Sequence, residues 1–365
     1  MMKILPCGCV RRLADIINDE ESGSLWSQLP IDILVSIALF LDKNDAVQFC
    51  STCKAWALVA PLVKQPKAKA PLLLLPPDSD GTCELFDVTH RKTHFIHAPE
   101  IMKTEMLYSR DGWLLASGNG FTFFLNPFTK EKIQLFPSRV PRYLCAFSSQ
   151  PVLPDCLVFF IRSLYPNRVR IEMYRVHSKK MTDATFRNEK PFKQASTNPV
   201  FCNGYFYCLG KDGKLGVFNP RDLIWTISSP RADTDFKKSE VKYLIQSRGE
   251  LFVACEAGAK VRVFWLERSK MKWTEMKKLG KRMLFLHSNS SFLAGTDSDE
   301  HNVNRIFFPR MRRYTRKCCV SFSLDACRYH PSRELFECRN FDSDMMKPLW
   351  IEAEEFDPLA KLVQS

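Results

Sequence analysis

Short apolar segments recur along the chain at nearly even intervals, and this repeat constrains the fold more than any other feature. Each segment usually follows a polar turn that contains Gly or Pro. The segments are "PLLLLP" at 71, "GWLLASG" at 112, "DCLVFFI" at 155, "GYFYCLG" at 204, "GELFVAC" at 249 and "SSFLAG" at 290, at intervals of 41, 43, 49, 45 and 41 residues. Many units continue with a second strand, a polar turn and a third strand, as in "FFLNPFTKEKIQL". A period of ~40–50 residues with several strands per unit is typical of β-propeller blades.

The number of units predicts the number of blades. Six openings predict about six blades, and seven is an open alternative because the last unit is longer and less regular. The late segment "KPLWIEAEEF" is predicted to contain a strand that completes one blade. An Asn-Pro pair occurs at 126 and again at 219, at the same point of two units, and predicts a turn after a strand. A β-sandwich is the alternative architecture, and the even spacing disfavours it.

The residues before about position 65 follow a helical pattern instead. Ile33, Ile37 and Leu41 recur at helical spacing and predict a helix over about residues 30–41. Asn44 is the predicted N-cap of a second helix, and a third helical piece follows. Three short helices bury little apolar surface among themselves. We therefore expect another chain to cover their second apolar face. The alternative is that the helices pack on the protein's own second domain.

The stretch "WSQLPIDILVSIALFLDKNDAVQFCSTCKAW" resembles an F-box. It has the Leu-Pro start, an Ile- and Leu-rich helix, an acidic interruption at Asp42, and Cys53 and Trp56 three residues apart. Thr52 and Lys54 replace the usual Val and Arg without removing an apolar anchor. The resemblance implies binding to the Skp adaptor of a Skp–cullin–F-box ubiquitin ligase, and through it to cullin and RING subunits. The residues expected to contact the adaptor are Leu29, Pro30, Ile33, Leu34, Ile37, Leu41 and Trp56.

The remaining chain resembles the Kelch-related, KIB-type propeller that follows the F-box in a large group of plant F-box proteins. The resemblance rests on "PLLLLP", "DGWLL", "FLNPFT", "GVFNP" and "PLWIE" in that order. No WD pair or kelch double glycine recurs at the repeat period. The implied fold is an α+β multidomain chain, with a small three-helix F-box followed by an all-β propeller. The implied function is that of a non-catalytic substrate receptor, whose propeller binds a target protein for ubiquitination.

Changes in composition predict the domain boundaries. We expect a flexible N-terminal segment at 1–24, the F-box helices at 25–63 and a Pro- and Lys-rich linker at 64–70. The propeller is expected at 71–356 and a C-terminal tail at 357–365.

The formal net charge of +13 motivates an alternative function, a regulatory protein that binds nucleic acid through a basic propeller face. Lys and Arg are spread along the whole chain, which makes a single basic face less favoured. The densest basic run is "RMRRYTRK" at 310–317. On one interpretation this run is a solvated surface loop. On the other, its basic side chains contact an acidic partner, and these are Arg310, Arg312, Arg313, Arg316 and Lys317.

No established catalytic motif is present: the sequence contains no GxSxG elbow, P-loop, HExxH or strand-associated GxGxxG. We therefore predict no catalytic, metal-binding or cofactor-binding residues. An enzyme in the propeller channel is the less favoured alternative, and its sign would be titratable side chains that converge there. Cys50 and Cys53 have zinc or redox spacing, but no second pair follows, so buried helix positions are favoured. Asn119-Gly120 is predicted to be a hairpin turn.

The 14 Cys residues do not indicate a disulfide framework in a chain of 365 residues. The opening "MMKILPCGCVRRLADIINDEESG" lacks the pattern of a signal peptide, and no apolar stretch reaches the ~20 residues that a transmembrane helix needs. We expect an intracellular protein of the nucleus, the cytoplasm or both, with reduced thiols.

Overall fold

The computed structural model describes the chain in two separate units, residues 1–68 and 69–365. The described residues are 29, 33, 34, 37, 49, 56, 70–137, 143–232, 236, 241–257, 260–295, 303–309, 319–330 and 347–352. In the first unit, Ile33, Leu34, Ile37, Phe49 and Trp56 lie in helices, as the sequence predicts. No helix in the described part of the chain is long and apolar enough to span a membrane.

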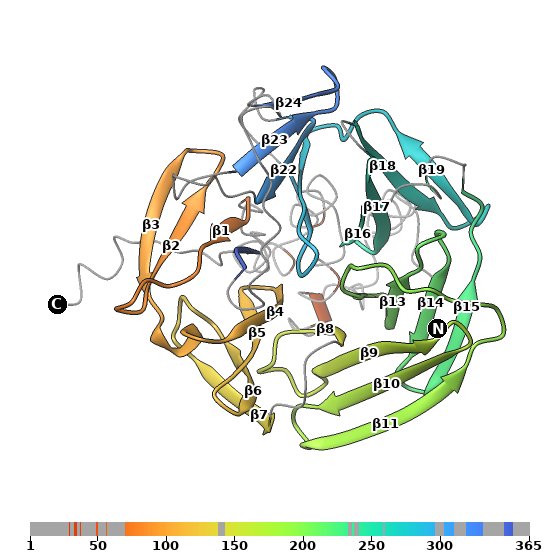
Figure 1. Ribbon diagram of the computed structural model, residues 1–365, viewed down its shortest axis with the longest axis horizontal. Helices are drawn as coiled ribbons and strands as arrows, with labels where there is room; N and C mark the ends of the chain where they lie inside the picture. Colours follow the sequence, from red (N-terminus) through yellow and green to blue (C-terminus); the bar gives the residue numbers. More distant parts are fainter. Residues whose placement is uncertain are drawn as a thin grey trace, which may run out of the picture. The chain divides into compact units, whose positions relative to one another are not determined.

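The described strands of the second unit form six sheets, which are the blades of a propeller (Figure 1). Blade 1 has the order β25 (Leu349–Ile351), β1 (Leu72–Leu74), β2 (Thr82–Asp87) and β3 (Lys92–His97). A 3-10 helix, η2 (Pro99–Ile101), leads to blade 2, which has the order β4 (Glu105–Arg110), β5 (Trp113–Gly118), β6 (Phe121–Leu125) and β7 (Lys132–Pro137). Blade 3 consists of β8 (Leu144–Phe147), β9 (Leu157–Tyr165), β10 (Arg168–Arg175) and β11 (Lys180–Arg187).

The other three blades complete the ring. Blade 4 consists of β12 (Val200–Cys202), β13 (Tyr205–Leu209), β14 (Leu215–Asn219) and β15 (Ile224–Ser228). Blade 5 consists of β16 (Val241–Ser247), β17 (Glu250–Ala257), β18 (Lys260–Glu267) and β19 (Lys272–Met276). Blade 6 has the order β21 (Phe292–Gly295), β20 (Arg282–Phe285), β22 (Arg305–Pro309), β23 (Cys319–Ser323) and β24 (Arg328–His330). The prediction of six blades is confirmed.

The core of this unit lies between neighbouring blades. The apolar clusters join side chains of adjacent sheets, as where Leu74 and Leu85 of blade 1 pack with Leu114 and Phe123 of blade 2. The middle strands are therefore covered on both faces, which explains why they read as continuous apolar runs. The outer strand β15 alternates instead between buried and exposed side chains, because only its inward face is covered.

The tight turns between strands use residues that tolerate a left-handed backbone. Asn119 and Gly120 join β5 to β6 with φ of 53° and 84°, and Asn203 and Gly204 join β12 to β13 with φ of 49° and 86°. Two consecutive positive φ values are characteristic of type I′ hairpin turns, which favour Asn-Gly. The predicted hairpin at Asn119-Gly120 is confirmed.

The Asn-Pro pairs also form the turns that the sequence predicts. The side chain of Asn126 follows β6 and accepts hydrogen bonds from the backbone N–H groups of Phe128 and Thr129 at 3.0 and 3.1 Å. Asn219, at the end of β14, accepts one from Arg221 at 3.0 Å. Both side chains stabilise the turn between the third and fourth strands of their blades.

Strand β25 closes the ring, as predicted from "PLWIE". It pairs antiparallel with β1, with Leu73 opposite Trp350, so the first blade joins strands from both ends of the propeller sequence. Trp350 is fully buried. Its ring packs edge to face on Phe285 with centroids 5.0 Å apart, and its indole N–H donates to the carbonyl of Leu286 at 3.2 Å. These contacts connect blade 1 to blade 6.

Blade 6 differs from the sequence prediction. We expected "SSFLAG" to open the sixth unit, but it contains β21, which lies at the inner end of the sheet and pairs antiparallel with β20. Strand β20 is therefore parallel to β22, and Leu284 is paired with Ile306. The reason is that the chain makes one additional hairpin at residues 286–291 before the regular meander continues. This hairpin enters the centre of the propeller.

We predict that Trp350→Ala lowers the free energy of unfolding of the propeller by ~3–5 kcal/mol, because it empties a fully buried site and removes the bond to Leu286. The measurement is urea denaturation of the full chain, followed by fluorescence. Phe95→Ala is the matched control, since Phe95 is an aromatic residue of the same blade that is 64% exposed, and it should change stability by no more than ~0.5 kcal/mol. Equal losses in both variants would contradict the closing role of Trp350.

Candidate functional site

The predicted adaptor-binding residues of the first unit differ in exposure. Ile33 is 44% exposed, whereas Leu34 and Trp56 are 2% and 7% exposed. The rings of Phe49 and Trp56 stack with centroids 4.2 Å apart, so Trp56 has an internal packing role. Leu29 and Ile37 are half-buried. Of the residues described, Ile33 is the one most available to a partner.

The other predicted contact residues lie outside the described residues. These are Pro30 and Leu41 in the first unit and the basic set Arg310, Arg312, Arg313, Arg316 and Lys317 in the second. Their roles stay predictions.

The centre of the propeller contains a polar site that the sequence did not predict. The inner strands β25, β4, β8, β12, β16 and β21 contact one another in this order around the centre. At one end, the 286–291 hairpin is fixed by Asn198, whose side-chain amide donates to the carbonyls of Leu107 and Asn289 at 2.7 and 3.1 Å. The carbonyl of the same side chain accepts the backbone N–H of Cys145 at 3.0 Å. Asn198 therefore connects blades 2, 3 and 4 to the hairpin.

The hairpin makes further bonds to the surrounding strands. The side chain of Asn289 donates to the carbonyl of Met106 at 2.7 Å. The hydroxyls of Ser290, in the hairpin, and of Ser109, in β4 of blade 2, both donate a hydrogen bond to the carbonyl of Trp350. These bonds satisfy polar groups that would be costly if left buried and unpaired. They make the hairpin a rigid floor for the channel.

Arg110, the last residue of β4, organises the ends of the inner strands beside this floor. Its guanidinium donates to the carboxylate of Asp111 at 3.2 Å and to the carbonyls of Phe147 and Phe201 at 3.4 and 3.3 Å. The positive charge is thus held against the channel wall by an ion pair and two carbonyl dipoles. Arg110 connects blade 2 to blades 3 and 4 at the ends of their inner strands.

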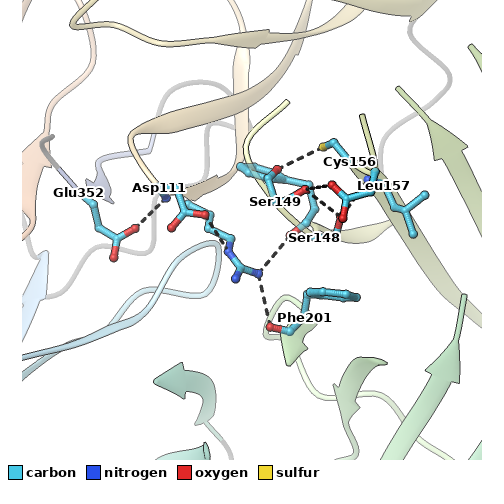
Figure 2. A network of polar contacts seen from close by, with 10 residues as sticks. Asp111, Ser148, Ser149, Cys156, Leu157, Phe201 and Glu352 are labelled. Carbon is cyan, nitrogen blue, oxygen red and sulfur yellow. Dashed lines mark hydrogen bonds and ion pairs between the residues drawn. The ribbon is translucent and has the colours of Figure 1, made fainter. Parts of the chain in front are cut away.

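The loop between β8 and β9 is fixed beside this network (Figure 2). The hydroxyl of Ser148 accepts the backbone N–H of Leu157 at 2.9 Å. The thiol of Cys156 donates to the carbonyl of Ser149 at 3.1 Å, and burial raises the pKa of this thiol to about 12. Cys156 is therefore protonated at neutral pH and structural rather than nucleophilic.

Glu352, directly after the closing strand, brings a second carboxyl group to the same end of the channel. One of its oxygens accepts the backbone N–H of Asp111 at 2.7 Å, as Figure 2 shows. Burial, together with the neighbouring Asp111 carboxylate, raises the pKa of the Glu352 carboxyl to about 7, although the hydrogen bond from the Asp111 backbone and the charge of Arg110 partly oppose the shift. Although some of its surface is accessible, the group lies in a protein-lined cavity where the charged form is poorly solvated.

These groups line one cavity of about 80 Å³, between the hairpin floor and the ends of the inner strands. This volume has room for several water molecules or the end of one side chain. Its lining includes Arg110, Asp111, Phe201, Gln246, Phe292 and Glu352.

His287 lines the same cavity from the floor and is uncharged. Burial, together with the charge of Lys347, lowers the pKa of its imidazole to about 4. Its Nδ1 atom accepts the backbone N–H of Asn289 at 3.2 Å, which leaves Nε2 as the N–H donor of the neutral ring. His287 is therefore not a cationic partner for Glu352 at neutral pH.

Titratable groups therefore converge in the channel, which is the feature expected of an enzyme with its active site there. Their bonding does not form an activated nucleophile among the described residues. The hydroxyl of Ser291 donates to the carbonyl of His287 at 2.8 Å, and those of Ser109 and Ser290 also donate to a carbonyl. None is hydrogen-bonded to an imidazole nitrogen as a Ser–His pair requires. Within the described ranges, no group of three or more His, Cys, Asp and Glu residues could hold a metal ion. The arrangement favours binding of a small polar or charged group.

The sequence contains a weak signal for this site. Asp111-Gly112 is a turn sequence at the start of one repeat, and Glu352 follows the segment predicted to close a blade. Had "PLWIE" been assigned as the inner strand of the first blade, both carboxylates would have been expected at the same end of the channel. The floor could not have been expected, because the additional hairpin interrupts the repeat.

Comparisons with known proteins agree with both halves of this architecture. The family described as KIB1-4 beta-propeller matches residues 85–330, and the F-box domain matches residues 26–60. The F-box/kelch-repeat protein At1g57790 of Arabidopsis thaliana is 30% identical over 350 residues, which cover 92% of this chain and 96% of that protein. The F-box proteins At4g00893 and At3g56470 of the same plant are 29% and 26% identical, over 85% and 84% of this chain and 82% and 84% of their own length.

We predict that Asn198→Ala lowers the free energy of unfolding by ~2–4 kcal/mol, since it removes three hydrogen bonds and leaves buried backbone groups of blades 2 and 3 unpaired. Urea denaturation of the full chain measures the loss. Asn167→Ala is the control, because Asn167 is exposed in the turn between β9 and β10 and should change stability little. An Asn198 variant as stable as this control would show that the floor of the channel does not depend on that side chain.

Proposed function

Because this chain belongs to the plant F-box proteins that carry a KIB1-4 beta-propeller, we propose that it is the substrate-recognition subunit of a Skp–cullin–F-box ubiquitin ligase. The coarser role, an F-box adaptor with a propeller, follows from the family. The observation that carries the finer proposal is the F-box match at residues 26–60 directly before a closed propeller. In this arrangement one part of the chain docks on the ligase and the other presents a rigid surface.

The mechanism is positioning rather than chemistry by this chain. The F-box helices bind the Skp adaptor, and the cullin and RING subunits hold the ubiquitin-loaded E2 enzyme. The propeller binds the target protein and keeps its lysines near the E2 at a high effective concentration. A rigid scaffold serves this purpose, because loops and turns fixed on a closed ring lose little entropy when the target binds.

The predicted adaptor-binding residues differ in how much of each side chain is exposed, and this difference suggests two roles for them. Ile33, at 44% exposure, is proposed to contact the Skp adaptor directly, together with Leu29 and Pro30 at the helix start. Leu34 and Trp56 are proposed to support that surface from inside, because they are almost fully buried. Apolar residues at the centre of an interface contribute most of its binding free energy.

We predict that Ile33→Ala, and the double variant Leu29→Ala with Pro30→Ala, weaken binding to the Skp adaptor by ~30-fold or more, which corresponds to ~2 kcal/mol. Pull-down and titration calorimetry with the purified adaptor measure the loss. Leu34→Ala should instead lower the stability of the first unit, since it removes a buried side chain.

The matched control for the pull-down is Ile224→Ala, an equally large apolar residue that is 53% exposed on the outer strand β15. It should bind the adaptor like the original chain. Circular dichroism and thermal unfolding establish that the propeller is folded in every variant. Undiminished adaptor binding by the Ile33 and double variants would refute the assigned contacts. A folded original chain that binds no Skp adaptor would refute the ligase role.

A further inference from the structure

The carboxyl group of Glu352 forms no ion pair with a basic side chain among the described residues, although the charge of Arg110 acts on it. One carboxyl oxygen accepts the backbone N–H of Asp111 at 2.7 Å, and no hydrogen bond to the other oxygen is found in the described part of the chain. Arg110 is nearby, but its Nε atom is paired with Asp111 and its Nη1 atom donates to two carbonyl groups. When both carboxyl groups are ionised, two carboxylates and one guanidinium leave this end of the channel with an excess of negative charge.

The cavity next to Glu352 has the size and walls to accept one charged group. Its volume is about 80 Å³, and Phe201 and Phe292 are among the residues that line it. Gln246 also lines the cavity and adds an amide group for hydrogen bonding. The end of an aliphatic side chain that carries a cation fits this volume, with its charge next to the carboxyl groups.

We propose that this cavity binds the ammonium or guanidinium group of a basic side chain of the target protein, with the Glu352 carboxylate as its anchor. The assignment of the group to a target rests on the proposed function. The cation site itself rests only on the geometry of the channel. Asp111 supports the site as a second carboxylate, and the ion pair with Arg110 keeps its carboxylate at the channel mouth.

The charge balance favours a cation over the other ligand classes. An anion would be placed beside the carboxyl groups of Asp111 and Glu352, and the nearby charge of Arg110 is already paired with Asp111. A neutral ligand would supply no counter-charge and would leave the carboxyl of Glu352 to be protonated in this poorly solvated cavity. A cation satisfies the free oxygen and forms a charge-assisted hydrogen bond, which is stronger than a neutral one.

The site predicts a pH dependence with a definite sign. The pKa of Glu352 is about 7 in the free protein, so the carboxyl is protonated in about half of the molecules at neutral pH. The charged groups that act on it are Asp111 and Arg110, and His287 is neutral in this range. A bound cation favours the ionised carboxylate, so affinity increases as the pH increases through 7. A lysine ammonium, with a pKa of ~10.4, stays charged throughout.

The first experiment measures binding of n-butylammonium chloride to the full chain by ligand-observed NMR, with n-butanol as the neutral analogue. Butylammonium should bind and butanol should not. Glu352→Gln removes the charge but keeps an oxygen for the N–H of Asp111, and it should weaken butylammonium binding by ~10-fold or more. Glu189→Gln, at an exposed carboxylate outside the cavity, is the matched control and should bind like the original chain.

The pH series uses the same probe between pH 6 and 8. The fraction of ionised Glu352 increases about tenfold over this range for a pKa of about 7, so the Kd of butylammonium should decrease about tenfold. In Glu352→Gln the Kd should not change with pH. Equal binding of butanol and butylammonium, or an affinity that is the same in Glu352→Gln as in the original chain, would overturn the cation site.

The second experiment tests whether the cation belongs to a polypeptide. A random heptapeptide library is selected against the full chain, and then against Glu352→Gln. Peptides with Lys or Arg should be enriched on the original chain and lost on the variant. Enrichment of peptides without basic residues, or equal retention by both proteins, would overturn the assignment to a target side chain.

These experiments separate the inference from the proposed function. Neither uses the Skp adaptor, so a chain that fails to bind the adaptor can still bind butylammonium and basic peptides. Adaptor binding together with no cation binding would overturn the inference and leave the ligase role in place. Butylammonium binding without any basic peptide would reject the target side chain and assign the site to a free amine.

Discussion

The pairing of β25 with β1 is the interaction on which the second unit depends. No blade has a core of its own, because the apolar clusters lie between sheets. Each sheet is therefore stable only while both neighbours are present. The chain reaches its last blade with one face of that blade uncovered, and the three residues of β25 bring the first blade against it. Trp350 adds the contacts that fix this junction.

The same closing segment also determines the chemistry of the channel. Glu352 follows β25 directly, so its carboxyl group reaches the channel mouth only when the ring is closed. The floor on the other side comes from the extra hairpin of blade 6, which Asn198 holds in place. The cavity, with its polar floor and acidic mouth, thus results from two departures from the regular repeat. These are the closing strand β25 and the additional hairpin of blade 6. The formal charge of the whole chain is +13, so this acidic mouth is a local exception to the overall charge.

Much of the fold could be predicted because the repeat is physically simple. Strands covered on both faces must be apolar along their length, and the turns that join them need Asn, Gly or Pro, so the unit boundaries are visible in the sequence. The closing strand was visible as "PLWIE". The segment "SSFLAG" was expected to open the sixth unit, but it forms β21, the innermost strand of blade 6. The sequence does not distinguish the two positions, because an innermost strand and a middle strand are both short apolar runs.

The candidate site was largely beyond prediction from the sequence. Asp111 and Glu352 are 241 residues apart, and only the closed ring makes them neighbours. Neither belongs to a recognised catalytic motif, and the elevated pKa of Glu352 depends on burial that spacing does not reveal. The F-box contacts were inferred from a local pattern, and local patterns do not distinguish an exposed residue such as Ile33 from its buried neighbour Leu34.

The position of the closing strand has a consequence for synthesis of the protein. Synthesis runs from the amino end, so β1 is made long before β25 and the propeller is open in the meantime. Until residue 351 emerges, β1 presents an unpaired strand edge, which is a template for pairing with other chains. Chains that lack β25 should therefore be prone to aggregation. Quality control of this protein would act on chains in which this strand is missing.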